Sequence, residues 1–188
     1  VCLYSTQSKR LVRTFNEHDN VVDVVCFSTE KADAVYIEHN GTSDQKTFIK
    51  DLARRREQQK VAAELSNGTA PTSNNNNSAL EVYQPRFVVS GGRDKNVIMR
   101  DVTSGTVALK FEGHENWVQG AAFTSSGKHL VTCADDGLLL VLDLMTKRVS
   151  RRIEAHQHFV TCLSLHPLGK PLLLTGSADT SVKLWPCK

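Results

Sequence analysis

The stretch HENWVQGAAFTSSGKHLVTCADDGLLLVL, residues 114–142, decides the fold of this chain. It places His114 18 residues before Thr132, which is followed four residues later by Asp136 and six residues after that by Leu142. The same order of residue types returns from His156, about 42 residues further along. A motif that returns at this period indicates a repeat architecture, in which each repeat is one supersecondary unit.

Three sets of residues share this internal order of a His, a hydroxyl residue, an Asp and a residue at a bulky position. They are His114, Thr132, Asp136 and Leu142; His156, Thr175, Asp179 and Trp185; and His18, Ser90, Asp94 and Arg100. In the third set the His and the hydroxyl residue are 72 residues apart, so about 50 additional residues interrupt that unit. An insertion confined to one connection of a repeat maps to a loop on one face of the array.

The composition changes at the borders of this insertion and divides the chain into three parts. Residues 1–27 alternate as strands, residues 28–85 form the insertion, and residues 86–188 hold the remaining repeats. Within the insertion only residues 34–37 alternate as a strand would, and residues from about 47 to 65 are rich in helix formers. We therefore predict a helix over about residues 47–65, followed by a low-complexity, disordered segment.

The bulk properties of the chain exclude several classes of protein. Short strand-like runs separated by Gly, Asp and Ser turns indicate antiparallel β-structure. The net charge of +3 is too small for a nucleic-acid-binding field, and no apolar run approaches the roughly 18 residues of a membrane span. The five cysteines are scattered and odd in number, which favours a reduced, intracellular setting over a disulfide framework.

The repeating pattern resembles the WD-repeat β-propeller, whose blades are four-stranded antiparallel sheets. In that family the His, the Ser or Thr, the Asp and a Trp form a buried hydrogen-bond network in each blade. The resemblance implies an all-β fold with about three and a half blades of a seven-bladed ring, interrupted by one long, partly helical and partly disordered insertion. Only the last set has the Trp; Leu142 and Arg100 depart from the pattern, and Tyr4 fills that position in the partial first blade.

Several runs of the chain are more specifically similar to the C-terminal blades of the lissencephaly protein (NudF) family. They are FVVSGGRDKNVIMRD, GHENWVQGAAF, AHQHFVTCLSL and TGSADTSVKLW. That family regulates dynein and is also the non-catalytic subunit of platelet-activating factor acetylhydrolase. The resemblance implies a non-enzymatic protein-interaction platform that binds and regulates the cytoplasmic dynein motor in microtubule-based transport, nuclear migration and cell division. The alternative is a WD-repeat scaffold of another complex, such as one with the acetylhydrolase catalytic subunits.

The resemblance also implies a binding face. Successive connections of a blade alternate between its two faces, so the His-bearing and Asp-bearing turns share one face and the insertion emerges on the opposite one. On the shared face Arg93 and Trp117 stand at positions that contact the motor domain in the family, and an Arg beside an exposed Trp is typical of an interface hot spot. The predicted contact surface is completed by Lys95, Asn116 and His158. The family's Lys after the CADD motif is Gly137 here. In the alternative interpretation, Trp117 caps the core and Arg93 is a solvated turn residue.

The residues that repeat are expected to be structural. His18, His114 and His156 belong to different blades and do not converge on a metal, and no GxSxG, HExxH or P-loop motif is present. We therefore expect no enzyme activity, no metal and no cofactor.

The resemblance also predicts the partners and the cellular location. The main expected partner is the dynein heavy-chain motor domain, with dynein adaptor coiled coils or acetylhydrolase catalytic subunits as further ones, and neither nucleic acid nor membrane insertion. The full-length protein is expected to be a homodimer through a missing N-terminal region. Its expected location is the cytoplasm, on the microtubule cytoskeleton and at the centrosome or spindle pole.

Overall fold

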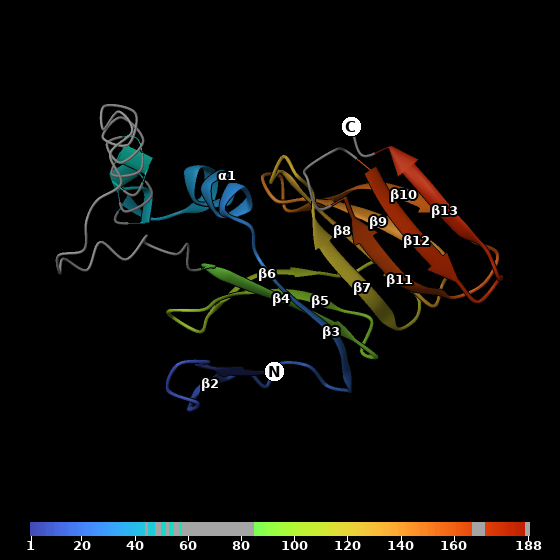
Figure 1. The fold of residues 1–188 in the computed structure, drawn as a ribbon, viewed down its shortest axis with the longest axis horizontal. Coiled ribbons are helices and arrows are strands. Elements are labelled where there is room, and N and C mark those ends of the chain that lie inside the picture. The colour runs from blue at the N-terminus through green and yellow to red at the C-terminus, as the bar shows by residue number, and fades with distance from the viewer. Residues whose placement is uncertain are drawn as a thin grey trace, which may run out of the picture.

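The chain folds into antiparallel sheets that follow one another in sequence order (Figure 1). The computed structural model describes residues 1–43, 45–47, 50–51, 53–54, 57, 85–166 and 172–186. Two of its sheets are four-stranded, one is three-stranded and one is two-stranded. The prediction of an all-β fold made of consecutive propeller blades is confirmed.

We name the sheets blades A to D in chain order. Blade A contains β1 (Cys2–Tyr4) and β2 (Leu11–Thr14). Blade B contains β3 (Val22–Phe27), β4 (Phe87–Gly92), β5 (Val97–Asp101) and β6 (Val107–Phe111). Blade C contains β7 (Val118–Phe123), β8 (His129–Ala134), β9 (Leu138–Asp143) and β10 (Arg148–Glu154). Blade D contains β11 (Val160–Leu165), β12 (Leu172–Ser177) and β13 (Val182–Pro186).

Neighbouring blades pack face to face because side chains alternate between the two faces of each strand. In blade C, Leu130 and Leu142 lie opposite each other across β8 and β9 and belong to the core shared with blade B. Their neighbours Val131 and Val141 point the other way, toward a second core shared with blade D. Blade C therefore contributes to two cores, which explains why its inner strands β8 and β9 are apolar almost throughout.

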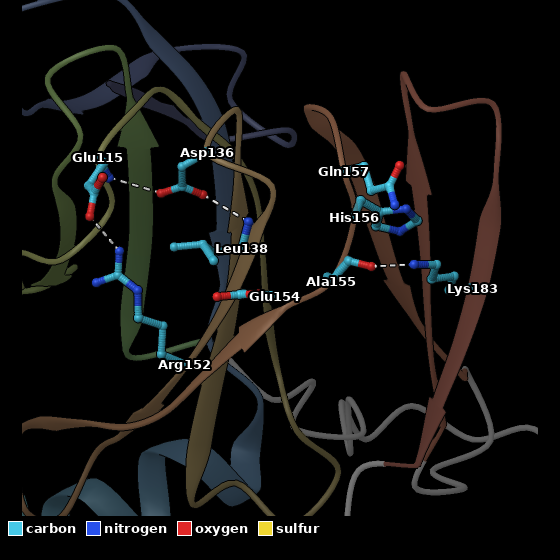
Figure 2. A pocket seen from close by; sticks show the side chains of 9 residues that line it. All are labelled: Glu115, Asp136, Leu138, Arg152, Glu154, Ala155, His156, Gln157 and Lys183. Carbon is cyan, nitrogen blue, oxygen red and sulfur yellow. Dashed lines mark hydrogen bonds and ion pairs between the residues drawn. The ribbon is translucent and has the colours of Figure 1, made fainter.

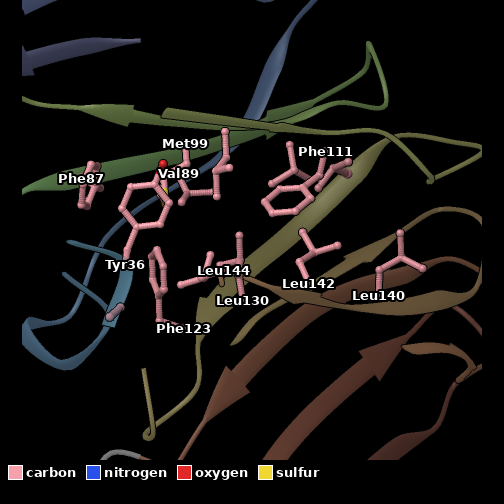
Figure 3. Close-up of a cluster of buried hydrophobic side chains, with 14 of the residues drawn as sticks. Tyr36, Phe87, Val89, Met99, Phe111, Phe123, Leu130, Leu140, Leu142 and Leu144 are labelled. Carbon is pink, nitrogen blue, oxygen red and sulfur yellow. The ribbon is translucent and has the colours of Figure 1, made fainter. Parts of the chain in front are cut away.

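The core between blades B and C is the larger of the two and is shown in Figure 3. Phe87, Val89 and Met99 from blade B meet Leu130 and Leu142 from blade C. Burying a side chain of this size stabilises the fold by about 1.5–3 kcal/mol each. This core also receives side chains from a helix that the sequence did not predict.

That helix is α1 (Glu30–Asn40). The strand-like interpretation of residues 34–37 is therefore wrong. Thr29 caps the helix, since its Oγ1 accepts a hydrogen bond from the backbone N–H of Ala32 (3.3 Å). Ala32, Tyr36 and Ile37 recur at a helical spacing and are all buried in the core between blades B and C.

Specific contacts hold α1 across the seam between blades B and C. The Tyr36 ring packs edge-on against Phe87 at 5.0 Å between centroids, and its hydroxyl donates to the carbonyl oxygen of Ala108 (3.2 Å). On the other blade, the side-chain amide of Asn40 donates to the carbonyl oxygen of Leu144 (3.3 Å). A Cβ on Gly127, in the β7–β8 turn, would lie 2.4 Å from the carbonyl carbon of Lys31. The helix therefore lies on the side of the blades opposite the His-bearing turns.

The rest of the insertion is described only in part. The described residues between 43 and 57 are helical, so helical structure begins before the predicted start at about 47. The remainder of the predicted helix over about 47–65, and the predicted disordered segment, lie outside the described residues. In the described part of the chain, no helix combines the length and apolar character that a bilayer crossing requires.

Candidate protein-interaction surface

Each of blades B, C and D contains a His that bridges a hydroxyl and a carboxylate. In blade C, His114 Nδ1 lies 2.9 Å from Asp136 Oδ2, and its Nε2 lies 2.9 Å from Thr132 Oγ1. The corresponding distances from His18 to Asp94 and Ser90 in blade B are 2.7 and 2.8 Å. From His156 to Asp179 and Thr175 in blade D they are 2.9 and 2.8 Å. The structure thus brings together the three sets that the sequence spacing singles out.

The chemistry of the groups gives these networks a direction. An ionised carboxylate only accepts hydrogen bonds, so Nδ1 of the neutral ring donates to it and Nε2 accepts from the hydroxyl. In blade D the hydroxyl of Thr175 accepts in turn from the indole N–H of Trp185 (2.9 Å). The hydrogen bonds therefore run from Trp185 in β13 through Thr175 and His156 to Asp179, in the turn before β13. This network ties the strands of the blade together.

Arg100 replaces the Trp of this chain in blade B. Its Nη1 donates to Ser90 Oγ at 2.7 Å, the role that the indole has in blade D. The side chain is fully buried, and its Nε donates to Glu17 Oε2 at 2.6 Å. Arg100 thus keeps the donor of the network and takes a counterion from the segment before blade B. Leu142, at the same position in blade C, is buried and apolar.

The carboxylates of the networks are held in the ionised form. Burial alone would raise the pKa of Asp136, but hydrogen bonds from His114 and from the backbone N–H groups of Glu115 and Leu138 outweigh it, so this pKa lies below its ordinary 3.8. The pKa of Asp179 is lowered mainly by the hydroxyl of Ser181, with the backbone of Ser181 and His156 contributing. These hydrogen bonds fix the turns that carry the candidate surface.

The networks lack the exposure that catalysis requires. The hydroxyls of Ser90, Thr132 and Thr175 belong to residues that are buried at 0–1% exposure, so a substrate cannot reach them. Among the residues described, no group of three or more His, Cys, Asp or Glu side chains gathers as a metal site would require. The arrangement is suited to fixing turns rather than to transferring groups.

Arg93 and Trp117, from blades B and C, meet on the surface beside these networks. The guanidinium carbon of Arg93 lies 4.1 Å from the centroid of the Trp117 ring, a cation–π stack. Arg93 Nε also donates to Asp23 Oδ2 at 3.3 Å. The side chains remain accessible, with Arg93 39% and Trp117 38% exposed. The stack fixes an aromatic ring and a cation on the surface, and part of each is already used within the chain.

In every blade with a His network, the residue three positions after the network His is apolar and exposed, as Trp117 is. Val21 and Phe159, each three residues after a network His, are 50% and 43% exposed. Their carbonyl oxygens accept from Arg93 and Ala178, as that of Trp117 accepts from Asp135. Val21 and Phe159 were not among the predicted contact residues, although an alignment of the repeats on their His residues identifies both positions.

The other residues predicted for the contact surface lie on the same turns. Lys95 is exposed, with φ +66°. The side-chain oxygen of Asn116 accepts from the backbone N–H of Trp117 (2.9 Å). His158 Nδ1 accepts from the N–H of Phe159 (2.8 Å), and the two rings pack at 4.2 Å. Asn116 and His158 therefore position the apolar residue that follows each of them.

Gly137 departs from the family pattern for a steric reason that the structure makes visible. It has φ +79°. Lys95 and Thr180, the equivalent residues of blades B and D, carry side chains at a similar positive φ, but a Cβ on Gly137 would lie 2.6 Å from the carbonyl oxygen of His156. A lysine at this position would require the His156 backbone to move.

A cavity of about 560 Å³ lies next to this surface, between blades C and D (Figure 2). Arg152 pairs with Glu115 across one side of it at 2.6 Å, and Lys183 donates to the carbonyl oxygen of Ala155 on the other side (2.6 Å). These two cations are therefore already paired with groups of the chain, and the acidic Glu154 also lines the cavity, so the cavity is not suited to an anion.

Comparisons with known proteins agree with the WD-repeat fold. The WD domain, G-beta repeat family matches residues 105–143 and 147–186. The nuclear distribution protein PAC1 of Yarrowia lipolytica is 37% identical over 112 residues, covering 56% of this chain and 25% of its own length. Over the matched residues, the chain is similar to WD-repeat proteins that are named nuclear distribution proteins and lissencephaly-1 homologs. The nuclear distribution protein nudF of Aspergillus niger is 32% identical over 124 residues (53% and 28%). The lissencephaly-1 homolog of Dictyostelium discoideum is 30% identical over 105 residues (55% and 25%).

This chain spans about a quarter of the length of these relatives. Both matched WD repeats lie in the part of the chain that contains Trp117 and blades C and D.

Proposed function

We propose that this chain is a non-enzymatic interaction platform that binds the motor domain of cytoplasmic dynein and regulates it. The contact would be made by the face that carries Arg93 and Trp117. The observation that carries the proposal is the stack of the Arg93 guanidinium on the exposed Trp117 ring, formed by two neighbouring blades. The relatives named as nuclear distribution proteins support the same pathway, since moving nuclei along microtubules is work for a motor.

The stack suits a protein partner with exposed carboxylates. Trp supplies a large contact area with few rotatable bonds, and Arg can pair with a carboxylate through two parallel hydrogen bonds. Because Asp23 already accepts from Arg93 Nε, the partner's carboxylate would bind the outer edge of the guanidinium. Val21 and Phe159 extend the apolar contact to either side. Regulation would follow if the platform binds one conformation of the motor more tightly than the others.

The test is a binding measurement between the purified motor domain and this chain, with its Trp117→Ala and Arg93→Ala variants. Removing a hot-spot residue costs about 2 kcal/mol or more, so we expect the dissociation constant to rise about 30-fold or more for each variant. Tyr4→Ala and Arg148→Ala remove an exposed aromatic residue and an exposed Arg elsewhere on the chain, and should leave binding unchanged. Equal binding by all four variants would refute the proposed site.

Three further expectations belong to this proposal. The alternative partners, the acetylhydrolase catalytic subunits, can be measured in the same assay. A cytoplasmic location on the microtubule cytoskeleton would follow from motor binding. Homodimerisation of the protein stays a prediction.

A further inference from the structure

A second surface of the chain is an open groove between blades C and D. It has a volume of about 600 Å³ and lies on the side of the blades that also carries α1. Its floor is formed by Val131, Val141, Ile153, Leu173 and Trp185. The mouth carries three side chains that are cationic or can become so: Lys128, His129 and Arg151.

This groove is the repeat equivalent of the one that α1 fills. When the two blades are aligned on the hydroxyl residues of their networks, Val131 and Val141 of blade C match Val89 and Met99 of blade B. On the facing blades, Trp185 of blade D matches Leu142 of blade C. Two apolar walls of the same construction therefore line both seams of the propeller, and one of them holds a helix.

The two grooves differ at their mouths. His129 stands where blade B has Phe87, the residue that packs against Tyr36 of α1. Arg151 pairs with Val141 across the strands of blade C, and Leu109 pairs with Met99 in blade B. Because Val141 matches Met99, Arg151 stands where blade B has Leu109. The residues that line the groove between blades C and D, within the described part of the chain, include no Asp or Glu.

We propose that this groove is a docking site for an amphipathic helix of a partner protein that carries a carboxylate on its apolar face. Two apolar residues of that helix would take the places of Ala32 and Ile37 in the equivalent seam. The carboxylate would take the place of Tyr36 and meet His129 and Arg151. Helices in grooves are recognised in this way, by apolar anchors that share one face of the helix. The site does not involve Arg93 or Trp117.

The test uses a library of helices displayed on a stable helical hairpin, selected on the full chain and then measured individually. We expect the selected helices to share an apolar residue, an Asp or Glu four residues later and a second apolar residue directly after it, which is the spacing of Ala32, Tyr36 and Ile37 in α1. The Arg151→Glu variant should weaken their binding about tenfold or more, since it replaces attraction with repulsion. Ser150→Trp, which fills the mouth, should abolish binding.

Arg148→Glu is the matched control, since Arg148 is an exposed Arg of the same strand that does not line the groove. It should leave binding unchanged, as should Trp117→Ala, which separates this site from the dynein-binding proposal. Four outcomes would overturn the inference: no enriched helix, enriched helices without a carboxylate, binding that survives both groove variants, or self-association of the chain that Ser150→Trp removes. The last outcome would make a second copy of this chain the occupant.

Discussion

The buried Arg100 offers a direct test of how blade B is held together. Arg100 is fully buried, whereas the side chain of its partner Glu17 is 44% exposed. Removing one partner of a fully buried ion pair costs about 3–5 kcal/mol, because a charge is left without its counterion. Water can reach the Glu17 site, so we expect Glu17→Ala to lower the free energy of unfolding by about 1–2 kcal/mol.

Arg100→Met should behave differently, because it removes the buried charge itself. Apolar replacements of buried ionic groups are often neutral, and the equivalent residue in blade C is the buried Leu142. We expect a change within about 1 kcal/mol, since Ser90 keeps its bond to His18. In the Arg100→Met background, Glu17→Ala should then cost almost nothing.

The assay is urea unfolding followed by far-UV circular dichroism for the wild type, both single variants and the double variant. The cycle should give a coupling energy of about 1–2 kcal/mol between the two residues. If Glu17→Ala is equally damaging with and without Arg100, the ion-pair reasoning is refuted. Glu112→Ala, which removes an exposed carboxylate paired with Lys110, is the matched control and should have little effect.

Three further predictions concern the networks and α1. Trp185→Phe removes the indole donor to Thr175 and should cost about 1 kcal/mol of unfolding free energy, measured by the same urea assay; no loss would mean that the donor does not stabilise blade D. Tyr36→Ala removes the contact with Phe87 and should destabilise by about 3–5 kcal/mol. Amide hydrogen exchange should then rise first in α1, and uniform exchange would contradict a local anchoring role. Because folding lowers the pKa of Asp136, the unfolded state binds more protons near and below its ordinary 3.8, and stability should fall as the pH drops through that range. Asp136→Asn should flatten the pH dependence of the unfolding free energy below about pH 5, and an unchanged slope would show that another group is responsible.

The repeat could be predicted from the sequence because its defining residues are local to each blade. The His, the hydroxyl residue and the Asp of blade C lie within 23 residues of one another, and their spacing alone fixes the order of strands and turns. For Arg100, the sequence showed only that it departs from the Trp of the repeat pattern, and not which residue it pairs with. Its counterion Glu17 lies 83 residues earlier, and no local pattern connects the two.

The sequence did not reveal α1 for a related reason. Its buried face is short and includes Asp33, which interrupts the apolar pattern. The carboxylate of Asp33 accepts from the backbone N–H of Arg86 (2.8 Å), on the far side of the insertion. Whether such an aspartate faces solvent or the core depends on that distant partner. On the candidate surface, the resemblance predicts Arg93 and Trp117, but their stacking depends on how two blades meet.

The base of the insertion has a consequence for how this repeat tolerates added sequence. Ser28 and Phe87 bind each other twice, through the backbone and through the Ser28 hydroxyl, and Asp33 holds Arg86 beside them. β3 and β4 are thus joined as in a tight hairpin, although the long insertion separates them in the sequence. Lengthening a flexible loop costs only about 0.6 kcal/mol of closure entropy for each doubling. Because hydrogen bonds join the two ends of the insertion, it can change in length while the register of blade B stays the same.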